Sequence, residues 1–420
     1  SVAVPVVYKA VTGYDYEDLN DASQTAAVSL AYSVTLLMTA LANLFAVGGA
    51  GRIAQLLGRR DRDGAREVCA VSFWFALLAS TAFCVLFTLL SSPILRLCGA
   101  TDETYALACG YSRWVISVGG TFSILNTVLA NLIRADGSAF AASMGVSAGG
   151  IINMLLDPLF VLPRFLGMGA EGAGLATAIS NAAGMLILLG IIAARRRVGV
   201  VALRPGDLRA ARRHIGKILR IGLPSAVQFL LTLVAVGALT KFMSLYDTAA
   251  VAALGIVKKL DMLPLYFSIG VANGLLPLLA YNYSAENHER RHRIFLCGCA
   301  VAVGFSVVCV AGYEVFAPAL VRIFIGDAQT IAYGTKLLRI MVLAMPMMSV
   351  CYPMITQFQA MGRMRESLIC SILRKGSLDI PLLFVLNALF PLYGCAAVQP
   401  IVDCICMIVA IYFYKKLPTA

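Results

Sequence analysis

The stretch NMLLDPLFVLPRFLGMGAEGAGLATAISN, residues 153–181, predicts the end of one apolar helix, a short turn and the start of a second helix. Pro163 and Gly167 mark the turn. Within the first helix lies a carboxylate, Asp157, followed directly by Pro158. A carboxylate in an apolar helix of membrane length is costly, so it persists only where it faces water, a partner or a cation. The stretch therefore predicts a membrane helix with a functional carboxylate.

Asn153 lies four residues before Asp157, so both side chains fall on one helix face. Pro158 cannot donate to the carbonyl four residues earlier, which predicts a kink that frees backbone oxygens near the carboxylate. Oxygen-bearing side chains beside such a kink suit a proton or a small hard cation. The alternative is structural: a buried Asp157 paired with a neighbouring helix.

The composition indicates the class of protein. The chain has 420 residues, of which 60% are hydrophobic and only 13% are charged, about half the charged fraction of an ordinary soluble domain. Apolar runs recur along the whole length, which predicts a polytopic helical protein embedded in a lipid bilayer. The net charge of +12 does not indicate a nucleic-acid partner, because the basic residues gather in the connections between the apolar runs.

No cofactor is expected apart from a coupling ion. None of the twelve cysteines forms a CxxC pair, and most fall inside apolar runs, where cysteine behaves as a small hydrophobe. His288 and His292 have i, i+4 spacing, but they lie in a basic loop without a nearby third ligand, so a metal site is not expected there. The chain has no Walker motif, so ATP does not drive it. A membrane-embedded hydrolase or transferase has less support than a transporter.

The apolar runs predict eleven membrane spans. Residues 2–11 are apolar but interrupted by Pro5 and Lys9, and four acidic residues follow by residue 21, so residues 1–21 are interpreted as a truncated or divergent first helix that leads into an outside loop. We assign residues 1–194 to an N-terminal lobe (helices 1–6), residues 195–220 to a basic cytoplasmic linker, and residues 221–420 to a C-terminal lobe (helices 7–12). The predicted spans are Ala26–Leu57, Ala65–Leu90, Tyr105–Ala135, Ser138–Leu162, Ala170–Ala194, Leu223–Tyr246, Ala249–Tyr283, Ile294–Ala317, Ile331–Met361, Leu368–Pro391 and Tyr393–Tyr414.

Basic residues predict the orientation of the spans. They concentrate at alternate connections, including residues 59–66, 195–220 and 290–293, and at Lys415 and Lys416 near the end of the chain. Positively charged connections face the cytoplasm, so these connections and the C-terminus are expected on the cytoplasmic side.

Two pairs of motifs indicate an internal repeat. Asp157-Pro158 with the following Leu-Phe-Val resembles Asp379-Ile-Pro381 with its Leu-Leu-Phe-Val, and the two aspartates are 222 residues apart. The segment ending at Gly137 resembles the segment ending at Gly362, 225 residues later. Both copies have the same inside-to-outside direction. Two similar lobes related by an axis along the membrane normal are typical of an alternating-access transporter.

The chain resembles the multidrug and toxic compound extrusion (MATE) family from about Ala22 to the C-terminus. The matching pieces are residues 48–65, 129–137, 153–161 with 166–180, 221–229 and 252–287. The resemblance implies an all-helical membrane protein of two pseudo-symmetric six-helix lobes in the bacterial inner (plasma) membrane. It implies secondary-active efflux of small-molecule drugs, organic cations or amphiphilic compounds in exchange for H⁺ or Na⁺. A monomer is expected.

The resemblance also implies site residues. A coupling cation is expected at Asp157, Asn153 and Thr177; the family's first-helix aspartate has no secure match, Asp15 being nearest in spacing. Six residues are expected to line the substrate cleft through amides, aromatic faces and a thioether, although each could instead serve packing. They are Gln228, Asn273, Tyr281, Asn282, Met354 and Gln357.

Two interpretations stay open beside the exporter. A flippase for a lipid-linked sugar or cell-wall precursor would need a basic cleft for a phosphate group, and the basic residues at cleft depth are few: Lys241, Lys258, Lys259 and Arg339. The divergent first segment could indicate a decayed transporter.

In the second copy of the repeat, Asp379 is interpreted as the structural counterpart of Asp157, paired with Lys375 one turn earlier.

Overall fold

The computed structural model describes residues 22–416, except 98–101, 162–164 and 244, and these residues are all-helical apart from short turns. The expected first helix lies outside the described residues. Eight of the described helices are long and apolar enough to cross a membrane, or up to ten if each of two bent helix pairs forms one span. This confirms the prediction of an all-helical membrane protein.

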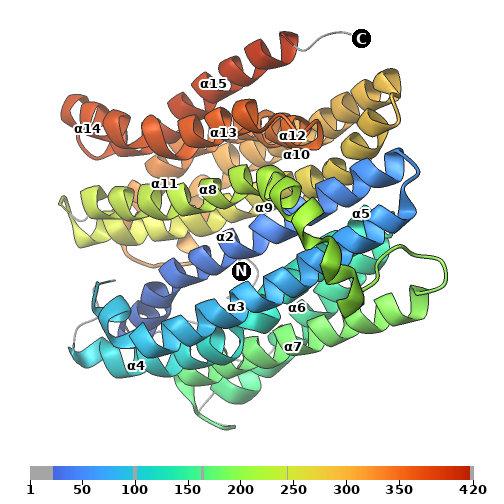
Figure 1. The fold of residues 1–420 in the computed structure, drawn as a ribbon. Coiled ribbons are helices and arrows are strands. Elements are labelled where there is room, and N and C mark those ends of the chain that lie inside the picture. The colour runs from blue at the N-terminus through green and yellow to red at the C-terminus, as the bar shows by residue number, and fades with distance from the viewer. Residues whose placement is uncertain (1–21, 98–101, 162–164, 244, 417–420) are drawn as a thin grey trace. The chain divides into compact units, whose positions relative to one another are not determined.

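The described chain forms two compact units, which we call the N-terminal unit (residues 22–230 and 280–286) and the C-terminal unit (residues 231–279 and 287–416). Figure 1 shows each as a bundle of long helices. The N-terminal unit contains α2 (Ala22–Gly58), α3 (Arg62–Leu97), α4 (Asp102–Ser112), a π-helical turn (Arg113–Val118), α5 (Gly120–Ala135), α6 (Ala139–Val161), α7 (Gly169–Arg195) and a 3₁₀ turn (Pro205–Ala210).

Two long helices, α8 (Ala211–Met243) and α9 (Thr248–Ser284), contribute to both units. The rest of the C-terminal unit is α10 (His288–Arg322), α11 (Ala328–Val342), α12 (Met345–Ala360), α13 (Met364–Ile372), a π-helical turn (Leu373–Ser377), α14 (Asp379–Leu389) and α15 (Tyr393–Lys415). The lobe and linker boundaries expected from the sequence stay a prediction.

Three of the eleven predicted spans are broken helices. The span 105–135 bends by 45° between the π-helical turn and α5, and the span 331–361 bends by 43° between α11 and α12. Two adjacent glycines, Gly119 and Gly120, lie at the first break, and Pro346 lies in the first turn of α12 at the second. The span Leu368–Pro391 is divided by a π-helical turn, so neither α13 nor α14 alone is long enough to cross a membrane.

The predicted repeat has a structural counterpart at two glycine turns. Gly137 and Gly362 follow α5 and α12, and both have a positive φ, of 83° and 70°. In each turn the next residue closes the same bond: Ser138 N–H donates to the Ile133 carbonyl, and Arg363 N–H donates to the Phe358 carbonyl. This is the Schellman pattern of helix ends, in which the positive φ favours glycine.

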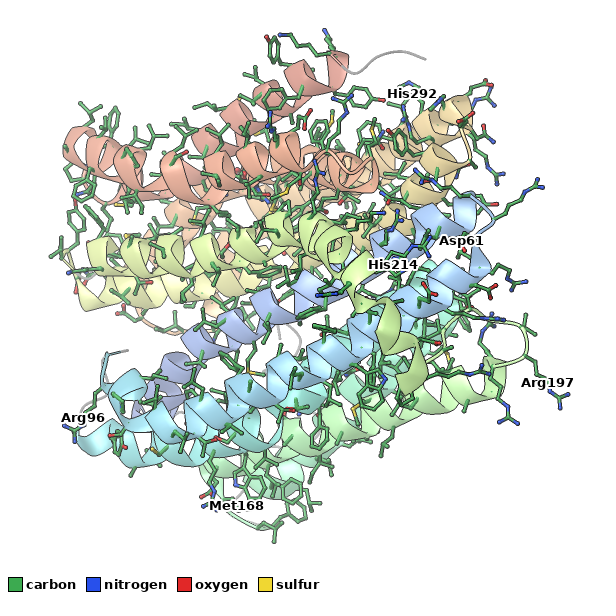
Figure 2. All side chains as sticks on the ribbon, viewed as in Figure 1. Asp61, Arg96, Met168, Arg197, His214 and His292 are labelled. Atoms are coloured by element: carbon green, nitrogen blue, oxygen red, sulfur yellow. The ribbon has the colours of Figure 1, made fainter. Side chains whose placement is uncertain are left out.

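In the N-terminal unit, the linker packs onto neighbouring connections. Arg62 donates to the Val198 carbonyl, and Val200 N–H donates to the Asp136 carboxylate at 2.9 Å. Burial raises the pKa of the Asp136 carboxyl, whereas the bond from Val200 and the charges of nearby arginines act in the opposite direction. The α2–α3 turn and the linker lie at one end of this unit, as Asp61 and Arg197 show, and Arg96 lies at the other (Figure 2).

Close contact between α2 and α8 depends on glycine. A Cβ atom on Gly222 of α8 would lie 1.9 Å from the Leu44 carbonyl oxygen of α2. A Cβ atom on Gly48 of α2 would lie 2.3 Å from the Ile218 carbonyl oxygen of α8. Small residues let membrane helices approach until their backbones touch, so this pair of glycines sets the crossing of the two helices.

Candidate functional site

Helix α6 presents two different faces. Ile151, Met154 and Leu155 are more than half exposed, as expected of side chains that meet lipid. Asn153 and Asp157 are only partly exposed, and α6 packs along α7, which carries Thr177. The apolar face therefore suits the hydrocarbon, and the polar residues lie where a neighbouring helix can share them.

The structure brings Asn153, Asp157 and Thr177 together. The Asn153 Nδ2 group lies 3.5 Å from Asp157 Oδ1 and 3.5 Å from Thr177 Oγ1. The Thr177 hydroxyl donates to the Ala173 carbonyl of its own helix at 2.9 Å. Both Asn153 contacts are at the upper limit of hydrogen bonding, so the amide restrains the carboxylate only weakly. Tyr111 of α4 lies close enough to Asp157 for electrostatic interaction.

Asp157 has no cationic partner in the part of the chain that the structure describes: no lysine or arginine there forms an ion pair with it. A half-buried carboxylate without a fixed countercharge is suited to bind a proton or a small cation. Rotation of the Asn153 amide by half a turn would present Oδ1 in place of Nδ2. Asn153, Asp157 and Thr177 would then offer three oxygen atoms, the ligand type that hard cations prefer.

Pro158 does not interrupt α6. The helix continues through Pro158 to Val161, so Pro158 does not break it. The physical reason is the position of Pro158 in the last turn of α6. Few helical hydrogen bonds lie beyond it, so the missing N–H group of the proline disturbs little of the helix.

The six predicted cleft residues are divided equally between the two units. Gln228, Tyr281 and Asn282 belong to the N-terminal unit, and Asn273, Met354 and Gln357 belong to the C-terminal unit. Their exposure differs. Tyr281 is 46% exposed, whereas Gln357 is fully buried and donates to the Met361 sulfur at 3.6 Å. The cleft assignment stays a prediction.

A buried polar network in the C-terminal unit was not foreseen from the sequence. Arg374 Nε donates to Asp403 Oδ1 at 2.7 Å, and neither side chain is more than 1% exposed. Lys375 Nζ donates to Gln399 Oε1 at 2.8 Å, and Gln399 Nε2 donates to Asp403 Oδ2 at 2.9 Å. The available signal was the occurrence of Asp403 and Gln399 inside the apolar span 393–414.

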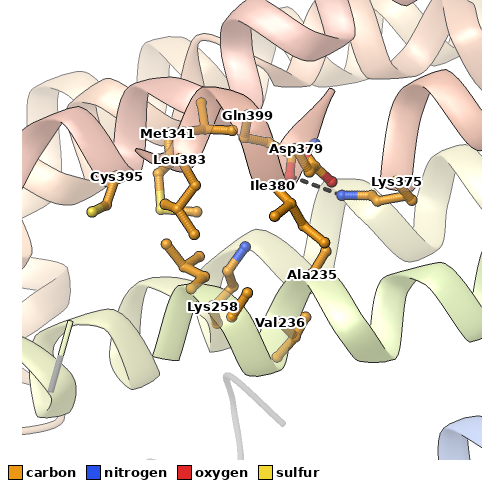
Figure 3. Close-up of a pocket in the computed structure, with 13 residues that line it drawn as sticks. Ala235, Val236, Lys258, Met341, Lys375, Asp379, Ile380, Leu383, Cys395 and Gln399 are labelled. Carbon is orange, nitrogen blue, oxygen red and sulfur yellow. Dashed lines mark hydrogen bonds between the residues drawn. The ribbon is translucent and has the colours of Figure 1, made fainter. Parts of the chain in front are cut away.

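This network corrects one expectation. Lys375 was expected to pair with Asp379 one turn later, but its ammonium group bonds to Gln399 of α15 instead. The π-helical turn at 373–377 is the physical reason, because an inserted residue changes the faces on which the side chains before and after it lie. Lys375, Asp379 and Gln399 line a pocket with an empty volume of about 460 Å³ (Figure 3).

A Gly-x-Ser-x-Gly sequence occurs at residues 145–149. In hydrolases this motif forms a sharp strand-to-helix turn that exposes the serine. Here Ser147 lies inside the continuous helix α6, so the motif lacks the backbone geometry that a nucleophile elbow requires.

The profile of the MatE family matches residues 3–159 and 224–385. The multidrug export protein MepA of Staphylococcus aureus is 29% identical over 406 residues, which cover 96% of this chain and 88% of the relative. MepA of Staphylococcus saprophyticus is 27% identical over 405 residues with the same coverage. These relatives are export proteins, which confirms the expectation of a transporter rather than an enzyme and does not favour a flippase.

Two solved structures have the same fold. A multidrug resistance MATE family transporter of the MOP superfamily, in an outward-facing conformation, aligns with a TM-score of 0.86 at 24% identity. A MOP superfamily transporter from Pyrococcus furiosus aligns with a TM-score of 0.86 at 25% identity. Each alignment covers 93% of this chain and 87% of the other. Because the MatE profile matches well over half of its residues, the chain belongs to the multidrug and toxic compound extrusion (MATE) family.

Proposed function

We propose that this chain is a secondary-active antiporter that exports organic cations or amphiphilic compounds in exchange for H⁺ or Na⁺. The coupling ion binds at Asp157, with Asn153 and Thr177 as neighbouring ligands. The observation that carries the proposal is a half-buried carboxylate within 3.5 Å of an amide and without an ion-pair partner among the described residues. Membership of the family and the names of the MepA relatives support export as the direction of transport.

The mechanism is a population shift. An ion at Asp157 neutralises the carboxylate. This removes the free-energy cost of holding a negative charge between packed helices that exclude water. The ion therefore stabilises whichever conformation buries the carboxylate more deeply, by its difference in affinity for the two conformations. Each charge that crosses 100 mV supplies about 2.3 kcal/mol, so one or two ions can support a useful concentration gradient of substrate.

Location and partners follow from the same proposal. The protein lies in the plasma membrane with its C-terminus in the cytoplasm, acts as a monomer and binds small molecules in a cleft that includes Gln228, Asn273, Tyr281, Asn282, Met354 and Gln357. The basic connections support the orientation. In the N-terminal unit, Arg62 and Val198 of two such connections are in contact.

Asp157→Asn abolishes ion-driven transport. The amide is close to the carboxylate in size but cannot take up a proton and binds a cation weakly. We expect ethidium efflux from proteoliposomes, driven by an imposed pH or sodium gradient, to fall at least tenfold in this variant. The control is Asp63→Asn, because Asp63 is a highly exposed carboxylate on α3, and its efflux should match that of wild type. Equal efflux in Asp157→Asn and wild type contradicts the proposal. The gradient that drives efflux in the wild type, of pH or of sodium, identifies the coupling ion.

Asn153→Ala distinguishes a proton from a sodium ion as the coupling ion at this site. A proton needs only the Asp157 carboxylate, whereas sodium also loses a ligand when the amide is removed. If sodium is the driving ion, we expect the sodium concentration for half-maximal efflux to rise at least threefold. If the proton is the driving ion, we expect little change in the pH dependence. Loss of efflux at every gradient, in protein that melts at the wild-type temperature, contradicts both roles.

A further inference from the structure

The pocket in the C-terminal unit has a polar end and an apolar wall. Its lining includes Lys258 of α9, Lys375, Asp379 of α14 and Gln399 of α15, together with aliphatic residues such as Leu239 and Leu383. Figure 3 shows Lys258 on one side of the pocket and Asp379 and Lys375 at the other. The pocket is open, and its empty space of about 460 Å³ includes solvent outside the protein, but a few polar groups beside an apolar wall have the character of a small-molecule site.

Two charged groups at this pocket lack a bonded partner. Asp379 is 7% exposed, and its Oδ2 atom makes no hydrogen bond. The Lys258 ammonium makes no hydrogen bond or ion pair with any residue that the structure describes, although it interacts at longer range with Asp261, Asp379 and Asp403. An unpaired buried charge is costly, so both groups favour a ligand that supplies the missing partners.

Of the other charged groups nearby, Asp261 does not line the pocket, and two are already engaged. Arg374 bonds to Asp403, and Lys375 bonds to Gln399. One free anionic oxygen and one free ammonium group therefore face the same pocket. A ligand with both a cationic donor and an anionic acceptor can pair with both groups at once.

We propose that this pocket binds a zwitterionic amphiphile, a molecule with an apolar body, an amino group that donates to Asp379 and an acidic group that accepts from Lys258. The apolar body packs against Leu239, Leu383 and the aliphatic residues around them. The inference that such a molecule is exported rests on the proposed transport function. The inference that it binds in this pocket is independent of that function.

Three dansyl probes test the proposal on the purified full chain in detergent, with no ion gradient. Nε-dansyl-L-lysine carries both groups, dansylcadaverine is the same molecule without the carboxylate, and 6-(dansylamino)hexanoate is the same molecule without the amine. Dansyl fluorescence rises in an apolar site and so reports binding. We expect Nε-dansyl-L-lysine to bind at least tenfold more tightly than either other probe. Equal affinity of the three probes overturns the proposal.

Variants identify the groups that recognise the ligand. Lys258→Met should weaken Nε-dansyl-L-lysine binding about tenfold and leave dansylcadaverine unchanged. Asp379→Asn should weaken Nε-dansyl-L-lysine binding and leave 6-(dansylamino)hexanoate unchanged. Lys259→Met is the matched control, because Lys259 is the next residue on α9 and is exposed. The same effect from Lys258→Met and Lys259→Met overturns the assignment.

Two further variants separate folding and transport from binding. If Lys258→Met lowers the melting temperature, Lys258→Arg is measured in its place. Lys258→Arg keeps the positive charge, so its affinity for Nε-dansyl-L-lysine should be within threefold of wild type. Loss of binding in folded Lys258→Arg contradicts the proposal. Asp157→Asn should bind the probe like wild type although its ion-driven efflux is lost. A failure of coupling at Asp157 is thereby distinguished from a failure of the pocket.

Discussion

Arg374→Met lowers the free energy of unfolding by about 3–5 kcal/mol, the cost of breaking a buried ion pair by removal of one partner. Arg374 Nε lies 2.7 Å from Asp403 Oδ1, and the guanidinium group also lies over the Tyr352 ring at 4.2 Å. Methionine fills a similar space but leaves the Asp403 carboxylate without its cation. Because Asp403 has no exposed surface, water cannot replace that partner.

Equilibrium unfolding in detergent micelles measures this change. The double variant Arg374→Met with Asp403→Leu removes both charges and should recover most of the lost stability, because the main cost is the unpaired charge and not the absence of the pair. Arg293→Met is the exposed control: its ion pair with Glu289 is more than three-quarters exposed, so its loss should change stability by less than about 1 kcal/mol. If Arg374→Met is as stable as wild type, the buried ion pair does not have the stabilising role described here.

Gly222→Ala lowers the free energy of unfolding by about 3 kcal/mol, at the upper end of the range for overpacking. Its new Cβ atom would lie 1.9 Å from the Leu44 carbonyl oxygen, far inside van der Waals contact. The obstacle is backbone and cannot change rotamer, so α2 and α8 must separate. Separation also loses the close contact between Gly48 and Ile218.

Gly216→Ala is the matched control for Gly222→Ala, six residues earlier on the same helix. A Cβ atom there meets nothing within 4 Å, so alanine should raise the helix stability by about 0.5–1 kcal/mol. Unfolding of both variants by guanidinium in the same detergent gives the comparison. If the two alanines have effects of the same sign, the crossing of α2 and α8 does not depend on Gly222.

The class of fold was predictable because its causes are local in the chain. Runs of apolar residues longer than the bilayer core must be helical there, since only helices and closed barrels satisfy every backbone group in lipid. Asn153 and Asp157 could be placed on one face for the same reason, because their spacing of four residues is a property of the helix alone. The glycine turns at 137 and 362 were likewise readable as a repeat, and the structure gives both the same hydrogen bonds.

The contacts between helices depended on the tertiary structure. The sequence could predict that Asp403 is costly in a membrane helix, but its partner, Arg374, comes from a segment about thirty residues earlier. Its orientation follows a π-helical turn that leaves no clear signal in composition. Lys375 illustrates the same point, because helical spacing favoured Asp379 and the folded chain provides Gln399 of α15. Hydropathy and spacing in sequence determine which residues enter the membrane and which face they share, whereas the pairing of charges depends on distances between helices that only packing sets.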